Sequence, residues 1–342
     1  MKVAVVGGGF SGLAFARKFR DCEVFNMGFT GTTGALSIPT IHEYNCEEFL
    51  RDEFVLWRFR SIKVDFFGEV IEEDFDRDVG LITDVKGMID FLKEGVNYIN
   101  KHITLNDFAE IVKKYDYVVS AGGVFSVGNK YLGLKHPERD DLHIGVQVDV
   151  KSRDEKRDVE VYVNELAPKG YVWCMRIDDD KYRVGFGVPK YLGINLHDRL
   201  KEVLKHTFTH YEALTKPYGG YIPTTKPLKR FKYGNIFLVG DSLHLCDPIT
   251  GGGIVYALAS GVDVANYLNG GRVKYIPKIK SMLNMRYHVK QVVFGMDVKK
   301  LKKLFEIVVK DVLGEGKLTP FRITKILMRY LMEYIVSSFK KA

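Results

Sequence analysis

A glycine-rich turn near the N-terminus places the strongest constraint on what this chain can fold into. The turn Gly7–Gly12 (GGGFSG) follows the apolar, β-branched run Val3–Val6 and precedes Leu13–Phe19, which has the composition of a helix. In a strand–turn–helix unit of this spacing, the first glycine allows a tight turn and the third lets the backbone approach a pyrophosphate. The last glycine allows the helix to pack closely on the strand. The pattern predicts a Rossmann-like βαβ unit with a dinucleotide at the helix N-terminus. The residues of this turn expected to contact the dinucleotide are Gly7, Gly9, Ser11 and Gly12.

The second predicted strand, Cys22–Asn26, completes the βαβ unit. In dinucleotide-binding folds this strand ends in an acidic residue that holds the ribose hydroxyls. Asn26 stands at that place, and its amide can accept one hydrogen bond and donate another. Binding of a ribose is therefore retained, but a conventional NAD site is disfavoured. The following Gly/Thr loop is either a surface turn or a second cofactor contact, made by Thr33 and Gly34.

The length and cysteine content point to a cytoplasmic protein of two domains. A chain of 342 residues is long enough for two hydrophobic cores. The fold is expected to begin at residue 2, which leaves no room for a cleavable secretory signal. The four cysteines form no CxxC pair, so neither a disulfide framework nor a zinc site is predicted. His206 and His210 have metal-ligand spacing on a predicted helix, but no third ligand is evident, and solvent exposure is favoured.

The positive charge of the chain is concentrated at its C-terminal end. Residues 272–342 hold 17 Lys+Arg and 5 Asp+Glu, a balance of +12, so the remainder, with 34 and 38, has a balance of −4. No nucleic-acid-binding signature accompanies this charge, and nucleic acid is not predicted as a partner. Apolar residues at helical spacing after Val298 predict helices in this region. These helices either cap the substrate domain or lie peripherally on an anionic membrane surface.

The middle of the chain changes from α/β to β character. Short β-branched or aromatic runs separated by charged turns predict an antiparallel sheet over residues 143–190. Residues 47–60 and 86–99 are predicted to be helical. The predicted fold is thus α/β, an FAD-binding-type Rossmann-like domain with an inserted antiparallel-sheet substrate domain and a helical C-terminal tail. The boundaries are 1–142 and 226–270 for the first domain, 143–225 for the second, and 271–342 for the basic tail.

A second glycine motif, some 230 residues after the first, specifies the cofactor more closely. A predicted strand ends at Gly240-Asp241, and Gly251–Gly253 opens the predicted helix Ile254–Leu268. The Asp241 carboxylate can accept a hydrogen bond from a ribityl or ribose hydroxyl. The positive end of the helix can face the pyrimidine edge of a flavin and stabilise negative charge there. The alternative is that Asp241 only caps the helix. The cofactor predicted from both motifs is FAD, and the contacts expected here are Asp241, Gly251, Gly252, Gly253 and Ile254.

Residues 1–268 resemble the flavoprotein family that includes para-hydroxybenzoate hydroxylase, and within it the geranylgeranyl reductase branch. Residues 171–176 (YVWCMR), followed by 185–187 (GFG), are similar to the branch signature Tyr-x-Trp-x-Phe-Pro … Gly-x-Gly. Residues 220–223 (GYIP), 240–242 (GDS) and 248–257 (PITGGGIVYA) are close to its flavin-binding pattern. Thr33 replaces the loop cysteine of the branch. Gly122-Gly123 replaces the Asp-Gly pair of the hydroxylases, which argues against an NADPH-using hydroxylase.

The resemblance implies an FAD-dependent oxidoreductase that reduces carbon–carbon double bonds of geranylgeranyl or polyprenyl groups in isoprenoid lipids. Its electrons would come from an external donor, NADPH or a ferredoxin-like protein. Tyr171 and Trp173 project from one strand face, where they either shape a flat slot for the prenyl chain or pair in the sheet core, and Tyr218 is expected near the pocket mouth. No catalytic acid is assigned, and His244 is interpreted as structural. The alternatives are an FAD-dependent hydroxylase or dehydrogenase acting on another apolar substrate, and a non-enzymatic prenyl-binding protein.

Overall fold

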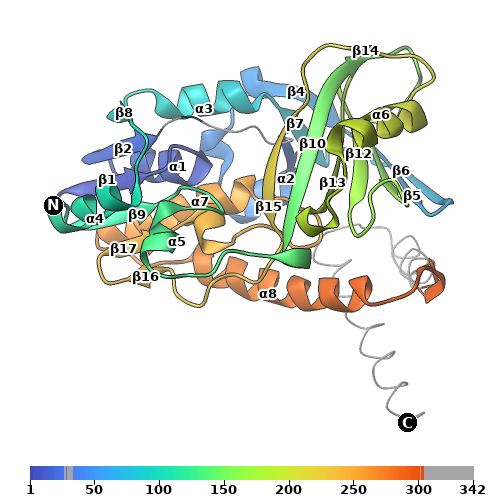
Figure 1. Cartoon of the computed structure of the whole chain (residues 1–342). Coiled ribbons are helices and arrows are strands. Elements are labelled where there is room, and N and C mark those ends of the chain that lie inside the picture. The colour runs from blue at the N-terminus through green and yellow to red at the C-terminus, as the bar shows by residue number, and fades with distance from the viewer. Residues whose placement is uncertain (27, 29–33, 301, 304–342) are drawn as a thin grey trace, which may run out of the picture.

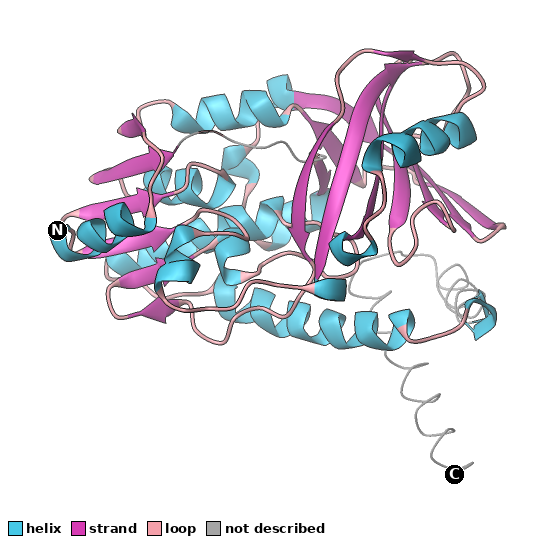
Figure 2. Ribbon diagram, in the orientation of Figure 1, coloured by secondary structure: helices cyan, strands magenta, loops and turns pink. Residues whose placement is uncertain are grey.

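Two large sheets stand side by side in the computed structural model, which describes residues 1–26, 28, 34–300 and 302–303 (Figures 1 and 2). A parallel sheet occupies the side of the N-terminus, and a tall, mainly antiparallel sheet occupies the other side. The long helix α8 (Tyr275–Phe294) runs along the base of the molecule beneath both. This arrangement confirms the predicted α/β class with an antiparallel sheet.

The parallel sheet has the topology expected of a dinucleotide-binding unit. Its central strand β1 (Val3–Val6) is buried along its whole length and pairs in parallel with β2 on one side and β9 on the other. Only the short edge strand β16 is antiparallel to its neighbour. In spatial order the strands are β16 (Lys232–Tyr233), β17 (Ile236–Leu238), β9 (Tyr117–Ser120), β1, β2 (Cys22–Asn26) and β8 (Tyr98–Asn100).

Helices α1 (Phe10–Lys18) and α7 (Ile254–Leu268) bring the two glycine motifs together. They cross at Gly261, where a Cβ atom would lie 2.2 Å from the Ser11 carbonyl oxygen. Only glycine permits that separation of the two backbones. The motifs that are about 230 residues apart in sequence are therefore held against each other by a glycine contact.

The second sheet is assembled from two separate stretches of the chain. Strands β5 and β6, from residues 61–74, join it through a parallel pairing of β5 with β11. The predicted boundaries placed these residues in the FAD-binding domain, so the sheet extends beyond the predicted insert. Its order is β14 (Glu212–Ala213), β10 (Leu142–Lys151), β13 (Lys181–Pro189), β12 (Tyr171–Asp178), β11 (Val159–Val163), β5 (Ser61–Phe66) and β6 (Glu69–Asp74), with β15 (Tyr218–Pro223) also paired to β10.

The helix predicted over residues 47–60 is wrong. Two single-turn 3-10 segments, Glu47–Phe49 and Asp52–Phe54, lead into strand β4 (Val55–Phe59). Exposure alternates residue by residue along β4, and this period of two is the signal that the helical interpretation overlooked. A three-stranded sheet forms from β3 (Ala35–Ser37), β7 (Gly80–Thr83) and β4.

The prediction of a helix over 86–99 is correct only for its first part. Helix α3 (Val85–Lys93) is capped by the Asp84 carboxylate, and the chain then turns at Gly95 into β8. The other helices are α2 (Ile38–Glu43), α4 (Leu105–Lys114), α5 (Val127–Tyr131) and α6 (Leu196–Thr207). The apolar positions predicted for the tail beyond residue 303 lie outside the described residues.

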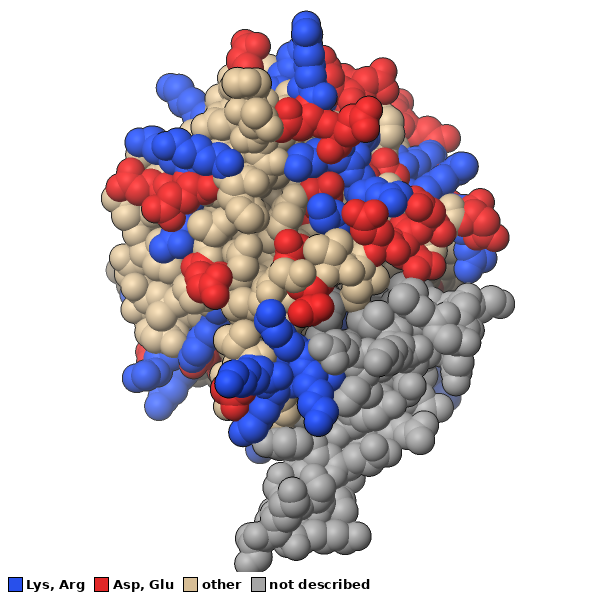
Figure 3. All heavy atoms as spheres, turned by 90° about the vertical axis from the view of Figure 1, so that its right-hand side faces the viewer, with Lys and Arg blue, Asp and Glu red and all other residues tan. Residues whose placement is uncertain are grey.

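The end of the molecule formed by the antiparallel sheet carries basic and acidic side chains intermingled, as Figure 3 shows. Ion pairs between strands and their connecting turns account for part of this pattern, including Arg157 Nη2 to Glu72 Oε2 at 2.9 Å and Lys151 Nζ to Asp180 Oδ2 at 3.0 Å. The face in Figure 3 therefore presents no broad field of one sign. Among the described helices, none is both long and apolar enough to cross a lipid bilayer.

Candidate cofactor and substrate site

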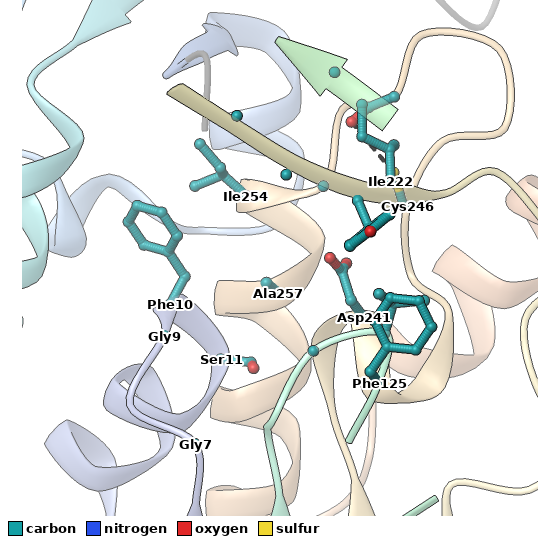
Figure 4. A pocket seen from close by; sticks show the side chains of 18 of the residues that line it. Gly7, Gly9, Phe10, Ser11, Phe125, Ile222, Asp241, Cys246, Ile254 and Ala257 are labelled. Atoms are coloured by element: carbon teal, nitrogen blue, oxygen red, sulfur yellow. Dashed lines mark hydrogen bonds between the residues drawn. The ribbon is translucent and has the colours of Figure 1, made fainter. Parts of the chain in front are cut away.

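A cavity of about 530 Å³ lies where the two sheets meet. Its walls are the glycine turn before α1, the loop after β9, the start of α7 and the inner face of the antiparallel sheet. Figure 4 shows the arrangement, with Ser11 and Phe10 of α1 on one side and Asp241 across from them. Most of the residues that the sequence singled out for the cofactor thus converge on one place.

The first glycine turn has the backbone shape that its spacing predicts. Gly7 adopts φ +118°, and a Cβ on it would lie 2.2 Å from the Ala121 carbonyl oxygen. Gly9 begins α1 without a side-chain cap, so the first N–H groups of the helix are left for an anion. Gly7, Gly9 and Ser11 line the cavity. Gly12 does not line it, because a Cβ there would lie 2.0 Å from the Gly7 carbonyl oxygen and its role is close packing.

Asn26 lines the cavity at the end of β2 and offers it an acceptor. Its Nδ2 donates to the Gly28 carbonyl oxygen at 2.9 Å and to the Tyr98 hydroxyl at 2.6 Å. Both amide hydrogens are therefore engaged, and Oδ1 remains to accept from a ribose hydroxyl. Gly34 does not line the cavity, because it packs on β7 and its carbonyl accepts from Thr83 Oγ1 at 2.9 Å. Thr33 lies outside the described residues.

Asp241 points its carboxylate into the cavity from the end of the second glycine-flanked strand (Figure 4). Within the described part of the chain no side chain or backbone N–H group donates a hydrogen bond to it, and burial raises its pKa from 3.8 to about 6. The helix-capping alternative is wrong, because α7 begins at Gly253 without a side-chain cap. An acceptor that is unpartnered and faces a cavity fits the hydroxyl group of a cofactor.

The loop before α7 is shaped from within by Asp247. Its Oδ1 accepts from the N–H groups of Ile249 at 2.9 Å and Thr250 at 3.3 Å. Its Oδ2 lies 2.8 Å from Nε of Arg286, a buried ion pair that ties the loop to α8. Gly251, with φ +68°, therefore presents its backbone to the cavity.

Gly253 and Ile254 at the start of α7 also line the cavity. Gly252 does not line it. Of the five contacts expected from the second motif, the structure thus brings four to the cavity.

The sheet contributes a flat, largely apolar wall to the cavity. Tyr171 and Trp173 lie on one face of β12 with ring centroids 5.8 Å apart, and both line the cavity. The indole of Trp173 lies against Gly145 and Gly185, where Cβ atoms would come within 3.5 and 2.7 Å of the ring. Trp173 Nε1 donates to Gln147 Oε1 at 3.3 Å. These residues form a slot, in which Gly145, Gln147, Tyr171 and Trp173 line the cavity and Gly185 and Gly187 lie on the same sheet face beside the Trp173 ring.

Tyr218 does not lie among the residues that line the cavity. Its hydroxyl donates to Asp149 Oδ1 at 2.9 Å, and Asp149 forms an ion pair with Arg183 at 2.9 Å. Tyr218 belongs to a polar cluster further along the same sheet face. The tyrosine at the cavity is Tyr221, three residues later on β15.

The lining residues that were not assigned to the site from the sequence include Phe125, Gln147, Tyr221 and Cys246. The pairing of β10, β13 and β12 places Gln147 and Trp173 opposite the same residue, Gly185, and register of this kind is not visible in one sequence. Cys246 is buried beside the cavity, with its thiol directed at the Gly251 carbonyl oxygen at 3.2 Å, and burial raises the pKa of the thiol. The sequence signal that could have identified Cys246 as a lining residue was its position two residues before Pro248 in the flavin-binding pattern.

The histidines offer no acid at the cavity. His244 does not line it, and burial lowers the pKa of its ring to about 4, so the ring is neutral at pH 7. Helix α6 ends at Thr207, so His206 and His210 are not a turn apart on one helix. Among the described residues no group of His, Cys, Asp and Glu side chains has the arrangement of a metal site.

The fold class follows from solved structures of similar shape. A geranylgeranyl bacteriochlorophyll reductase-like protein from Thermoplasma acidophilum matches 97% of this chain and 98% of its own with a TM-score of 0.77 and 19% identity. HpxO of Klebsiella pneumoniae, solved with FAD and uric acid, matches 96% of this chain and 95% of its own with a TM-score of 0.63 and 16% identity. The fold is therefore that of the FAD-dependent flavoproteins.

Curated relatives narrow this class. The digeranylgeranylglycerophospholipid reductase of Methanocella arvoryzae is 29% identical over 202 residues, 54% of this chain and 50% of that protein. The reductase of the same name from Thermoplasma acidophilum is 27% identical over 237 residues, 64% of this chain and 59% of that protein. The chain matches no protein-family model. The matches span about half to three fifths of these curated relatives, and they confirm the resemblance to geranylgeranyl reductases predicted from the two motifs.

Proposed function

We propose that this protein is an FAD-dependent oxidoreductase that reduces carbon–carbon double bonds in the geranylgeranyl or polyprenyl groups of isoprenoid lipids. The observation that carries the proposal is the position of the slot. The aromatic side chains of the sheet line the same cavity as the glycine turn and the Asp241 carboxylate. A flat apolar substrate in that slot would face a cofactor held by the other wall.

The residues of the first wall suit FAD. The start of α1 would hold the pyrophosphate, Asn26 Oδ1 a ribose hydroxyl, and Asp241 a hydroxyl of the ribityl chain or ribose. The backbone of Gly251 and Gly253 at the start of α7 would stabilise negative charge on the cofactor. When bound and reduced, FAD supplies the hydride for one alkene carbon, and a proton is needed for the other.

The slot residues would select and orient the lipid. Glycine at positions 145, 185 and 187 leaves the sheet face flat, so that an extended prenyl chain can lie along the Trp173 indole and the Tyr171 ring. The Tyr171 hydroxyl donates to the Thr250 carbonyl oxygen and thereby links the sheet to the loop before α7. The thiol of Cys246 and the phenols of Tyr171 and Tyr221 line the cavity as possible proton sources, and water is another.

We also propose that the enzyme works in the cytoplasm, peripherally at the inner face of the membrane, and takes electrons from an external donor such as NADPH or a ferredoxin-like protein. The charge balance of +12 in residues 272–342 supports attraction to anionic lipid. The four cysteines are free thiols, which suits a reducing compartment.

One anaerobic experiment tests the proposed reaction. The purified protein is saturated with FAD and photoreduced, and a geranylgeranylated lipid is then added without oxygen. The expected result is reoxidation of the flavin with a mass gain of two hydrogens for each double bond reduced. Trp173→Leu should slow the reoxidation while leaving FAD affinity within about twofold, because the indole lies on the substrate wall.

The alternatives have different results. Substrate-dependent consumption of oxygen with a hydroxylated product would support a hydroxylase and contradict the reductase. A protein that binds prenyl lipid but cannot be reconstituted with FAD would be a non-enzymatic prenyl-binding protein.

A further inference from the structure

Two aromatic side chains from different halves of the molecule line the cavity and are also exposed to solvent. Phe125 follows β9 of the parallel sheet and is 45% exposed, and Tyr221 belongs to β15 and is 41% exposed. Both residues line the cavity, and their rings meet edge to face with centroids 5.0 Å apart. Large aromatic rings that both line a cavity and remain open to water are suited to contact an apolar molecule that enters it across their surface.

Lys190 lies over these two rings and has no acidic partner among the described residues. Lys190 begins the turn Lys190–Leu192 after β13, and its Nζ lies 4.9 Å from the Tyr221 ring centroid and 5.9 Å from that of Phe125. Within the described residues no carboxylate oxygen lies within 4.0 Å of this ammonium group. The rings hold the ammonium group in place by cation–π attraction but leave its charge uncompensated.

The charge continues beside Lys190 around a third exposed ring. Tyr191 is 43% exposed, with Arg139 Cζ at 5.6 Å and Lys169 Nζ at 5.7 Å from its centroid. Lys169 is neutralised by Asp140 at 3.0 Å, whereas among the described residues no carboxylate oxygen lies within 4.0 Å of the Arg139 guanidinium. Lys190 is the cation that lies on the two exposed rings lining the cavity. The mouth patch, as we call this surface, consists of Phe125, Arg139, Lys169, Lys190, Tyr191 and Tyr221.

We propose that Lys190 at the mouth patch is an anion-binding subsite that takes the phosphate of an isoprenoid phospholipid while its prenyl chain lies in the slot. This inference rests on the proposed function and adds a determinant of substrate choice. The site has the same order of polarity as such a lipid, with an apolar aromatic slot inside, aromatic rings at the entrance and a cation outside. An ammonium group on aromatic rings at the water-facing end of an apolar channel is suited to an amphiphile with an anionic head.

The test compares two substrates that differ only in the phosphate. The holoenzyme is assayed with a bis-geranylgeranyl glycerol phosphate and with the phosphate-free diether, both in mixed micelles of an uncharged detergent. Lys190→Gln should raise KM for the phosphate lipid about fivefold with kcat unchanged, and should leave the diether unaffected. The increase should shrink in high salt, because an exposed ion pair is screened. Lys190→Arg should restore the KM of the original protein, and Lys205→Gln, on the exposed side of α6, is the matched control.

A binding measurement separates this proposal from the proposed function. The chain has two tryptophans, so in a Trp57→Phe background the fluorescence of Trp173 reports occupation of the slot. A fully saturated, non-reducible phosphate lipid should bind about fivefold more weakly to Lys190→Gln than to the parent. This comparison remains valid even if the protein reduces no lipid. Inorganic phosphate at millimolar concentration should compete only weakly, since it lacks the chain.

Three results would overturn the proposal. Equal KM changes for the phosphate lipid and the diether would assign Lys190 a packing role alone. Equal binding of the saturated phosphate lipid by Lys190→Gln and by the parent would show that Lys190 is not a phosphate subsite. A Lys190→Gln variant with normal lipid kinetics but slower reduction by NADPH would assign the charge to a nucleotide.

Discussion

The two faces of the eight-stranded sheet differ in almost every property although they are made by the same strands. One face packs on α6 with fully buried apolar residues, among them Val184, Phe186 and Leu204. The other face carries glycines, one indole, one amide and an ion pair, and it borders the cavity. Along β13 the two kinds of residue alternate, with Val184 and Phe186 on the packed face and Arg183, Gly185 and Gly187 on the open one.

The difference indicates that one face of the sheet stabilises the fold and the other face is available for binding. Apolar burial on the α6 face stabilises the sheet, and this allows the opposite face to give up side-chain packing at its glycines. An open face backed by a packed one is rigid, so that Trp173 and Tyr171 are held in place without any ligand. Substitutions on the two faces should therefore separate loss of folding from loss of function.

The largest effect on stability is expected on the packed face. Phe186→Ala should lower the free energy of unfolding by about 3–4 kcal/mol, because a fully buried aromatic ring leaves a cavity under α6. Urea denaturation of the apo-protein measures this value. Tyr211→Ala, at a residue 37% exposed, is the control and should cost less than about 1 kcal/mol. A similar loss in both variants would contradict the contrast between the faces.

The next effect concerns the ion pair at the far end of the open face. Arg183→Met should cost about 2–3 kcal/mol, since it leaves the partly buried Asp149 carboxylate without its cation. Adding Asp149→Asn should recover part of this loss, because the double variant buries no unpaired charge. Chemical denaturation of the single and double variants tests the pair. If Asp149→Asn lowered the free energy of unfolding further, the stabilising contact would be something other than this ion pair.

A substitution in the slot should leave stability nearly unchanged and remove function. A Cβ on Gly187 would lie 3.6 Å from the Trp173 ring and 4.0 Å from the Ile144 carbonyl oxygen, so a side chain fits there but projects into the slot. Gly187→Leu should change the free energy of unfolding by no more than about 1 kcal/mol. It should lower kcat/KM for geranylgeranyl lipid by at least about tenfold at unchanged FAD affinity. Full activity in this variant would show that substrate does not use the slot.

The smallest effect is expected from the pH dependence of stability that comes from Asp241, whose carboxyl group lines the cavity. The pKa of Asp241 is raised from 3.8 in the unfolded chain to about 6 in the folded protein. A carboxyl group shifted in this direction favours folding below about pH 4, and that contribution is lost as the pH rises through about 6. Asp241→Asn should therefore stabilise the apo-protein at pH 7, by on the order of 1 kcal/mol, and not at pH 4.

Thermal denaturation of both apo-proteins at the two pH values measures the Asp241 effect, and a fluorescence titration should show weaker FAD binding by Asp241→Asn. An equal shift in stability at both pH values would mean that the carboxyl group does not titrate as its burial requires.

Much of the fold could be predicted because its signals are local. The run VAVV and the boundaries Cys22–Asn26 and Ile254–Leu268 are found where composition placed them. The helical prediction for residues 47–60 was wrong, because the alternation of Val55–Phe59 belongs to a strand. The membership of β5 and β6 in the second sheet depends on a pairing with β11 that lies about 95 residues away, and no local pattern shows it.

The sequence by itself determined the kind of cofactor site, because glycine spacing at strand ends reflects backbone shapes that few other residues can adopt. The residues Gly7, Gly9, Asp241 and Gly251 meet at one cavity as their motifs predicted. Only the tertiary structure decided that Tyr221 rather than Tyr218 stands at the cavity, and that Gln147 and Phe125 belong to it. These positions depend on the register of strands and on the meeting of two domains, which are set by packing between residues far apart in the chain.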